Sequence, residues 1–261
     1  MSKRKCVVCE SSEATDFCLL EGHQYVMCTQ CGLVYLDDIS HTQEMYVAYS
    51  GGWFKSWRRR ITGPFRNFYK SKTYSSSKER SSHIFKFIDE HVQKSDVKQY
   101  LDIGCNKGFL LVEGIDRGWN VYGAELIEEV TYPFQNAFKK FKNNILTGKF
   151  EDIYPIIKDK KFELITAIDV IEHFEDPATD IRNIFSLLKP GGIFIIQTPD
   201  TASTQMANDK CGWLALKPNE HLHLFKSDNL KILAKKTGFS EYTAFDAFEE
   251  ADGNFCAMMR R

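Results

Sequence analysis

The chain has 261 residues, of which 43% are hydrophobic and 26% are charged, and its formal net charge is −1. This composition is ordinary for a globular protein, and the near-neutral charge argues against nonspecific attraction to nucleic acid or anionic membranes. No apolar run approaches the ~20 residues of a membrane-spanning helix, and residues 1–4 lead straight into polar sequence without a signal-peptide core. We therefore expect a cytoplasmic protein whose eight cysteines are reduced.

Two Cys-x-x-Cys pairs lie in the first forty residues, with 18 residues between them. This spacing is typical of a structural zinc site, in which four thiolates surround the ion and leave no open position for catalysis. A redox pair and unrelated thiols are the alternatives. We predict a zinc ribbon over residues 1–40, with Zn²⁺ bound by Cys6, Cys9, Cys28 and Cys31.

The residues between the two cysteine pairs are expected to form the short strands of this ribbon, at residues 17–18 and 24–27. So small a segment has little core of its own, so metal binding would supply much of its folding free energy. Cys18 and His23 are predicted to be a buried thiol and a loop histidine rather than further metal ligands.

Residues 41–80 combine aromatic side chains with arginines and contain Gly-Gly and Gly-Pro interruptions, which predict short helices joined by turns. One interpretation is a lid whose aromatics cover a site while its arginines contact phosphate or carboxylate groups. A second is a linker that packs its aromatics on the neighbouring domain, with its arginines solvated, and a third is a nucleic-acid-binding patch. The lid hypothesis nominates as substrate-binding residues Tyr46, Tyr49, Trp53 and Arg58. A serine run at residues 75–77 is expected to be a flexible joint, and a helix is expected from Glu79.

Residues 81–261 are expected to form one α/β domain, because apolar strand-like runs alternate with helical patterns. After an opening strand near Tyr100, strands are expected at residues 120–125, 144–148, 162–169 and 193–197, followed by two closing strands beyond Gly238. Helices are expected at residues 109–117, 128–141 and 177–188, with a turn at residues 189–192. This order predicts a doubly wound, mostly parallel sheet of seven strands.

A glycine-bearing turn, Asp102-Ile-Gly-Cys-Asn-Lys-Gly108, follows the opening strand. Glycine adopts backbone angles closed to other residues and lets a ligand approach the main chain. Glu125 ends the next strand 23 residues after Asp102, near the ~20-residue offset of the acidic residue that binds ribose hydroxyls in nucleoside-binding units. In such a sheet, Asp102, Glu125 and Asp169 would converge at the carboxyl ends of the strands.

Several motifs together resemble class I S-adenosylmethionine-dependent methyltransferases, which have a Rossmann-like fold. They are Leu-Asp-Ile-Gly-Cys-Asn-Lys-Gly, the strand-ending Glu125, Ile-Asp-Val-Ile-Glu-His, Leu-Lys-Pro-Gly-Gly, Glu-His-Leu-His-Leu-Phe and a later Thr-Gly-Phe. The resemblance covers about residue 81 to the C-terminus. It is closest to small-molecule enzymes with an N-terminal zinc ribbon, which often act in sugar, natural-product or surface-polysaccharide tailoring.

The resemblance implies a set of cofactor contacts, and Asn106 within it replaces the family's usual middle glycine. The implied cofactor-binding residues are Asp102, Gly104, Cys105, Asn106, Gly108, Glu125, Leu126, Phe150, Glu151, Asp169 and Val170.

Three histidines are candidate catalytic residues, because imidazole suits a general base near neutral pH: His173, His221 and His223. Strand alternation would direct His221 and His223 to one face. The alternatives are a positioning role for His173, and a metal held by His221 and His223 with Glu220 as third ligand. The insertion that carries Cys211, Trp213 and Lys217 is expected to determine substrate specificity.

The leading hypothesis is methyl transfer to a small polar acceptor, a sugar or a phosphate- or nucleotide-linked intermediate of surface-polysaccharide or natural-product biosynthesis. An RNA-modifying methyltransferase and a noncatalytic cofactor-binding scaffold are the alternatives. The ribbon's few basic residues, Lys3, Arg4 and Lys5, argue against an RNA partner. We expect no membrane partner. The sequence gives no prediction of the oligomeric state.

Overall fold

The computed structural model describes residues 4–40, 72–92, 98–246, 248 and 253–261. The predicted substrate-binding residues Tyr46, Tyr49, Trp53 and Arg58 lie outside these residues. The chain divides into two compact units. Residues 1–47, 168–185 and 195–261 form the first unit, and residues 48–167 and 186–194 form the second. The predicted domain boundaries at residues 40 and 80 stay predictions.

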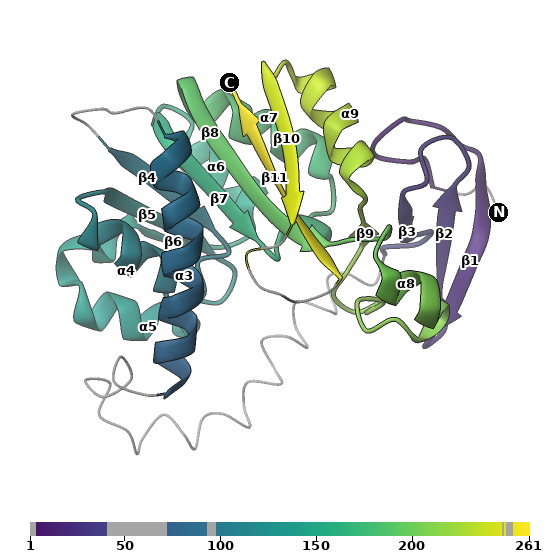
Figure 1. The fold of residues 1–261 in the computed structure, drawn as a ribbon, viewed down its shortest axis with the longest axis horizontal. Helices are drawn as coiled ribbons and strands as arrows, with labels where there is room; N and C mark the ends of the chain where they lie inside the picture. Colours follow the sequence, from purple (N-terminus) through teal and green to yellow (C-terminus); the bar gives the residue numbers. More distant parts are fainter. Residues whose placement is uncertain (1–3, 41–71, 93–97, 247, 249–252) are drawn as a thin grey trace. The chain divides into compact units, whose positions relative to one another are not determined.

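A seven-stranded sheet, ordered β10-β11-β8-β7-β4-β5-β6, forms the α/β body (Figure 1). Parallel pairing joins β4 to β5 and β7, and β5 to β6, whereas β10 and β11 pair antiparallel. This order confirms the predicted doubly wound, mostly parallel fold. The strands are β4 (Gln99–Ile103), β5 (Asn120–Glu125), β6 (Ile145–Thr147), β7 (Phe162–Ile168), β8 (Leu188–Pro199), β10 (Glu241–Asp246) and β11 (Asn254–Arg260).

Helices connect these strands, as the alternating pattern predicts. They are α3 (Lys72–His91), α4 (Phe109–Asp116), α5 (Glu128–Ala137), α6 (Phe150–Ile157), α7 (Pro177–Leu187), α8 (Thr204–Asp209) and α9 (Ser227–Thr237), with short 3₁₀ helices η3 (Lys139–Asn144), η4 (Ile171–His173) and η5 (Lys210–Gly212). Helix α3 packs on α4. The buried Phe85 of α3 meets the Tyr100 ring of β4 edge-on, with the ring centroids 5.5 Å apart. None of the described helices has the length and apolar character needed to span a bilayer.

The helix α3 differs from its prediction, because the serine run at residues 75–77 is helical and not a joint. Serine has only a modestly lower helix propensity than the best helix formers. The buried apolar face that includes Ile84, Phe85 and Ile88 stabilises the helix as a whole, and it outweighs this local preference.

Two further boundaries differ from the predictions. The helix predicted over residues 128–141 ends at Ala137 and is followed by η3. The turn predicted at residues 189–192 lies inside β8. Gly191 has a φ of +76° there, so β8 accommodates a local departure from extended geometry at the residues where the turn was predicted.

The N-terminal cysteine segment forms a second, four-stranded sheet ordered β1-β2-β3-β9. Its antiparallel neighbours are β1 (Ala14–Leu20), β2 (His23–Cys28), β3 (Val34–Leu36) and β9 (His223–Leu224). The two predicted ribbon strands fall within β1 and β2. His23 begins β2, so the predicted loop position of this histidine is wrong.

The hydrophobic core beneath this sheet is completed by a distant part of the chain. Tyr25 and Leu36 of the ribbon pack in one buried cluster with Trp213, Leu216 and Leu222. Burial of large side chains is the main favourable term in folding. The insertion at residues 211–224 therefore supplies apolar surface that the small ribbon lacks by itself.

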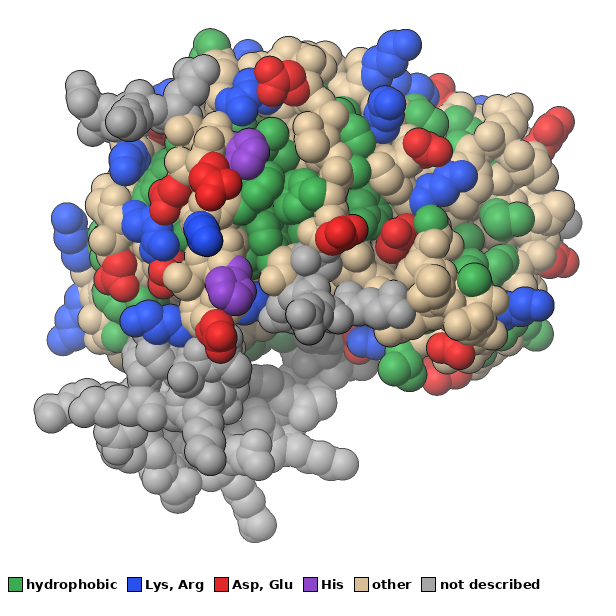
Figure 2. Space-filling view, in the orientation of Figure 1, with side chains coloured by type: hydrophobic (Ala, Val, Ile, Leu, Met, Phe, Trp, Pro, Cys, Tyr) green, Lys and Arg blue, Asp and Glu red, His purple; other side chains and the backbone are tan. Residues whose placement is uncertain are grey.

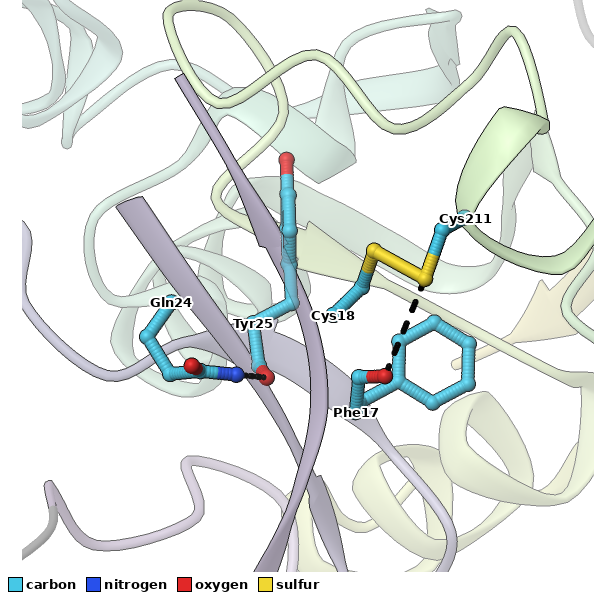
Figure 3. The surroundings of a disulfide bond; sticks show 5 residues. All are labelled: Phe17, Cys18, Gln24, Tyr25 and Cys211. Atoms are coloured by element: carbon cyan, nitrogen blue, oxygen red, sulfur yellow. Dashed lines mark hydrogen bonds between the residues drawn. A yellow bond between two sulfur atoms is a disulfide. The ribbon is translucent and has the colours of Figure 1, made fainter. Parts of the chain in front are cut away.

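A disulfide joins Cys18 of β1 to Cys211 of η5, with 5.7 Å between their Cα atoms (Figure 3). The Cys211 sulfur also lies 3.9 Å from the backbone oxygen of Phe17. The prediction of a free, buried Cys18 thiol is therefore wrong, as is the expectation that all eight cysteines are reduced. The two cysteines are separated by 193 residues, so no local spacing indicated the pair.

Candidate active site

The turn between β4 and α4 contains three residues in the left-handed backbone region: Gly104 (φ +73°), Asn106 (φ +47°) and Gly108 (φ +77°). The backbone N–H groups of Gly104 and Cys105 both donate to the oxygen of Ala124, at 2.8 and 3.1 Å. Asparagine tolerates the left-handed region better than most residues with a side chain. The local backbone therefore explains why an asparagine stands at a position where a glycine was expected.

Asn106→Gly is expected to leave S-adenosylmethionine affinity within a few-fold of wild type, because glycine adopts the same backbone conformation. Asn106→Val is the contrasting variant for Asn106→Gly. It is expected to bind S-adenosylmethionine more weakly, because a β-branched side chain at positive φ is strained. Calorimetric titration with S-adenosylmethionine would measure both. A large loss of binding in Asn106→Gly would show instead that the asparagine side chain makes a required contact.

Glu125 is held against this turn from the end of β5. One carboxylate oxygen accepts a hydrogen bond from the backbone N–H of Asn106 at 2.8 Å, and the other accepts from Ile127 N–H at 3.3 Å. Burial raises the pKa of Glu125, while the backbone donors favour its charged form. The structure therefore links two features that the sequence analysis paired through their spacing.

Asp102 is buried, with 3% of its surface exposed. Its carboxylate accepts a hydrogen bond from the Thr166 hydroxyl at 2.5 Å, and the same hydroxyl contacts the Tyr100 hydroxyl at 2.8 Å. Burial raises the pKa of Asp102 to about 7. The carboxylate that was predicted to bind the cofactor is thus held by Thr166 of the neighbouring strand β7.

The absence of a side chain at Gly108 leaves room for the ring of Phe134 on α5. A Cβ atom at Gly108 would lie 2.6 Å from Cδ2 of the Phe134 ring. The sequence analysis had assigned this glycine to close approach of a ligand. The structure adds a packing requirement that any substitution at Gly108 must meet.

Gly108→Ala is expected to lower the free energy of unfolding by more than Gly118→Ala does. Both glycines have a left-handed φ, +77° and +81°, but a Cβ at Gly118 meets nothing within 4 Å. Gly118→Ala therefore carries the backbone cost alone, ~1–2 kcal/mol, whereas Gly108→Ala adds overpacking of ~1–3 kcal/mol. Denaturant unfolding of the two variants measures the difference, and equal losses would contradict the packing role.

The remaining predicted cofactor residues of the second unit have ordinary surroundings. Cys105 is buried in the turn, and Leu126 is half-buried just after β5. Phe150 is buried at the first position of α6. The exposed Glu151 lies 3.7 Å from the Lys149 ammonium.

Asp169 is the residue just after β7 and belongs to the first unit. Its φ of +57° is uncommon for a residue with a side chain. Its backbone N–H donates to the oxygen of Gln197 at 2.8 Å, and its Oδ1 accepts from Gln197 Nε2 at 3.1 Å. Val170, the next residue, is half-buried. Strained backbone of this kind gathers at functional sites, and here β8 holds it in place.

His173 of η4 and His221 lie together, with ring centroids 4.9 Å apart. His173 Nδ1 is 2.7 Å from the oxygen of Glu220, and His221 Nδ1 is 2.7 Å from the oxygen of Ala215. A carbonyl oxygen can only accept, so each Nδ1 carries the proton and each Nε2 keeps its lone pair. Burial lowers the pKa of both rings, that of His221 to about 3.

His223 does not join this pair. The strand β9 begins at His223 and does not include His221, so the strand alternation on which the shared face was predicted does not reach His221. The shared face itself stays a prediction. His223 is fully buried, and its ring lies 6.2 Å from that of Phe225. Burial holds the pKa of His223 well below its ordinary value.

Glu172 is the residue that sequence reasoning missed. It is 1% exposed, and its Oε2 accepts a hydrogen bond from the Thr198 hydroxyl at 2.9 Å. The candidate ligand atoms of Glu172, His173 and His221 all lie within 4.8 Å of one another. Glu220, named in the sequence analysis as a possible metal ligand, instead pairs with the Lys217 ammonium at 3.5 Å.

Comparison with proteins of known family identifies the α/β body. A model described as a methyltransferase domain matches residues 77–243, more than half of the chain. A ubiquinone biosynthesis O-methyltransferase of Coxiella burnetii is 31% identical over 114 residues, which are 43% of this chain and 48% of that protein. One from Rickettsia bellii is 24% identical over 173 residues, 59% of this chain and 70% of that protein. The chain thus matches about half the length of the Coxiella relative.

Solved structures share the fold at low sequence identity. A SAM-dependent methyltransferase from Archaeoglobus fulgidus has a TM-score of 0.56 at 14% identity, covering 76% of this chain and 98% of that one. The magnesium protoporphyrin IX methyltransferase of Synechocystis PCC 6803, solved with bound SAH, has a TM-score of 0.56 at 17% identity, covering 84% of this chain and 99% of that one. The chain therefore belongs to the methyltransferase-domain family, and its α/β body has the fold of these methyltransferases.

Proposed function

We propose that this enzyme transfers the methyl group of S-adenosylmethionine to a hydroxyl oxygen of a small polar molecule. The observation that carries the proposal is the hydrogen bond from Asn106 N–H to the Glu125 carboxylate, which joins the glycine turn to the acidic strand end. When bound, the cofactor supplies an electrophilic methyl group on a sulfonium sulfur. The chain then has to bind it, orient the acceptor and handle the acceptor's proton.

The residues of the second unit fit this cofactor. Glu125 offers two carboxylate oxygens at the position expected for ribose hydroxyls, and Gly104 and Gly108 leave the main chain of the turn without Cβ atoms. We assign Glu125 to the ribose and residues 102–108 to the methionine part. Phe150 and Glu151 are assigned to the adenine. The cofactor-binding roles of Asp169 and Val170, which belong to the first unit, stay predictions.

The acceptor side is proposed to include His173. Its side chain is half-buried, whereas those of His221 and His223 are buried. A pKa of about 3 makes His221 too weak a base to take a hydroxyl proton near neutral pH unaided. Among the three predicted catalytic histidines, His173 is therefore the best placed to meet a substrate, with His221 beside it.

A hydroxyl acceptor is favoured because the curated relatives are named O-methyltransferases of ubiquinone biosynthesis. The match covers about half of the Coxiella protein, so we propose the shared chemistry and not the same substrate. The comparisons give no support to the predicted sugar or polysaccharide acceptor, which stays a prediction.

Structural zinc in the ribbon is the second part of the proposal. The sulfur atoms of Cys6 and Cys31 are 3.5 Å apart, and those of Cys9 and Cys28 are 3.4 Å apart. Four sulfurs at ~2.3 Å from a tetrahedral zinc ion would lie about 3.8 Å from one another. The cluster therefore needs little adjustment to hold the ion.

An RNA substrate is disfavoured by the way the ribbon uses its basic residues. The Arg4 guanidinium donates to the backbone oxygen of Glu175 at 2.9 Å and to that of Leu36 at 3.5 Å. On the described face shown in Figure 2, Lys and Arg side chains are interspersed with Asp and Glu. A binding surface for phosphate backbones would group its positive charges.

The test is conversion of S-adenosylmethionine to S-adenosylhomocysteine by the purified protein with panels of ring hydroxyls, sugar hydroxyls, nucleotide sugars and RNA. We expect turnover with a small hydroxyl compound and a mass increase of one methyl group on its oxygen. Calorimetry with S-adenosylmethionine runs in parallel. Cofactor binding without turnover in any panel would favour the scaffold alternative, and a methyl group found on nitrogen or carbon would overturn the hydroxyl assignment.

A further inference from the structure

We infer that Glu172, His173 and His221 form a binding site for a divalent transition-metal ion such as Zn²⁺, separate from the cysteine cluster. Their candidate ligand atoms all lie within 4.8 Å of one another, and the three residues belong to the same compact unit. Two imidazoles and one carboxylate are a donor set that catalytic zinc sites and non-haem iron sites both use.

The hydrogen bonds of the two histidines are of the kind that metal-binding histidines commonly make. In such sites the ring nitrogen away from the metal donates its proton to a carboxylate, a backbone carbonyl or water, which fixes the tautomer. Both rings here meet that condition, because each Nδ1 lies 2.7 Å from a backbone oxygen. Each Nε2 is thereby left with a lone pair for an ion.

The carboxylate is also held in place. Thr198 donates its hydroxyl to Oε2 of Glu172 at 2.9 Å, and the backbone oxygen of Glu172 accepts from Leu222 N–H at 2.8 Å. The second hydrogen bond ties η4 to the segment that carries His221. Ligands from two segments 49 residues apart are therefore fixed by contacts that do not involve the ion.

Charge and burial favour a cation at this place. Glu172 is 1% exposed, and its Oε2 is hydrogen-bonded by the neutral Thr198 hydroxyl. The Asp169 carboxylate adds negative charge nearby, and the Lys217 ammonium has a smaller opposing effect. A buried carboxylate is stabilised by a paired charge or a metal. Magnesium and calcium prefer all-oxygen sites, so the two imidazole nitrogens select a softer ion of the zinc class.

This inference rests on the proposed function for its role, although the binding itself does not. Three protein ligands leave a coordination position open, and His173, the half-buried member, marks the accessible side. A hydroxyl oxygen of the acceptor in that position would have its pKa lowered and release its proton to solvent. The O–CH3 bond would then form as the S–CH3 bond of the sulfonium breaks, and S-adenosylhomocysteine would leave as the neutral thioether. No group changes its oxidation state.

Metal binding can be measured without turnover. The full chain is depleted of metal, titrated with Zn²⁺ or Co²⁺, and its bound metal counted by elemental analysis. Cobalt held by four thiolates gives intense sulfur-to-metal absorption that a site of two histidines and a glutamate lacks. The spectrum therefore separates the two clusters whether or not the ribbon binds zinc.

Glu172→Gln and His173→Ala are each expected to bind one metal equivalent fewer than wild type, with unchanged far-ultraviolet circular dichroism. Glu220→Gln is the matched control, because this neighbouring carboxylate pairs with Lys217 and should leave the stoichiometry unchanged. Thr198→Val removes the hydroxyl that holds Glu172 and should weaken binding ~10–100-fold. Thr198→Ser keeps that hydroxyl and should bind like wild type.

Equal metal stoichiometry in wild type, Glu172→Gln and His173→Ala would overturn the inference. Loss of metal in Glu220→Gln but not in Glu172→Gln would overturn the assigned ligand set. Metal binding at this site together with failure of every acceptor panel would refute the proposed hydroxyl transfer and leave the metal site intact.

Discussion

Glu125→Ala is expected to weaken S-adenosylmethionine binding by about 100-fold. Hydrogen bonds to a charged group contribute ~1.5–3 kcal/mol each, and the loss of about 2.7 kcal/mol corresponds to a factor of 100 in Kd. The same substitution removes the acceptor for Asn106 N–H, so the turn loses a support as well as the ligand contact. Calorimetric titration gives Kd, and unfolding curves show whether the fold is kept.

Two variants give this prediction its controls. Glu125→Gln keeps one carbonyl acceptor and should lose less affinity than the alanine variant. Glu241→Ala removes an exposed carboxylate that pairs with Arg260 and is not among the predicted cofactor-binding residues, so it should change affinity only slightly. Wild-type affinity in Glu125→Ala would contradict the assignment of the ribose hydroxyls to this strand end.

Removal of zinc, or Cys28→Ser, is expected to unfold the ribbon and lower the melting temperature by roughly 10 °C. Structural zinc contributes ~10 kcal/mol or more to the folding of isolated zinc-finger peptides. We expect a smaller loss of several kcal/mol here, because Trp213 and Leu216 complete the ribbon core independently of the metal. In a domain of this size, 1 kcal/mol corresponds to ~2–4 °C.

The buried Trp213 reports on this transition. Its fluorescence should shift towards that of exposed tryptophan when zinc is removed, and comparison with Trp213→Phe identifies its share of the signal. Leu19→Ser, a change at an exposed position of β1, is the control and should leave both zinc content and melting temperature unchanged. An unaltered melting temperature in the chelated protein would show that the four cysteines do not hold a structural ion.

The α/β sheet was predictable because each central strand can be recognised from the apolar pattern of its own residues. Buried parallel strands form continuous apolar runs, and the strand expected at residues 120–125 has those bounds in the structure. The turn at residues 102–108 was equally local, since its glycines follow an apolar run directly. Asn106 looked irregular in the sequence, and only its φ of +47° showed why it is tolerated.

The contacts that escaped prediction all join residues far apart in the chain. Cys18 meets Cys211, and His173 meets His221, without any spacing that announces the pairing. Glu172 lies within one of the family motifs but was assigned no role, because the identity of an acidic residue does not reveal whether it is buried or exposed. Strand β9, only two residues long, carries too short a pattern to be recognised by periodicity.

The pairing of β3 with β9 can form only late in the synthesis of the chain. Residues 34–36 leave the ribosome early, but their partner at residues 223–224 is made almost 190 residues later. At ~5–20 residues per second, the nascent ribbon waits roughly 10–40 s with an unpaired edge. An exposed strand edge of this kind can pair with a strand of another chain and so promote aggregation. The four-cysteine cluster is complete once Cys31 has been made, so metal binding there would let the ribbon fold before β9 is synthesised.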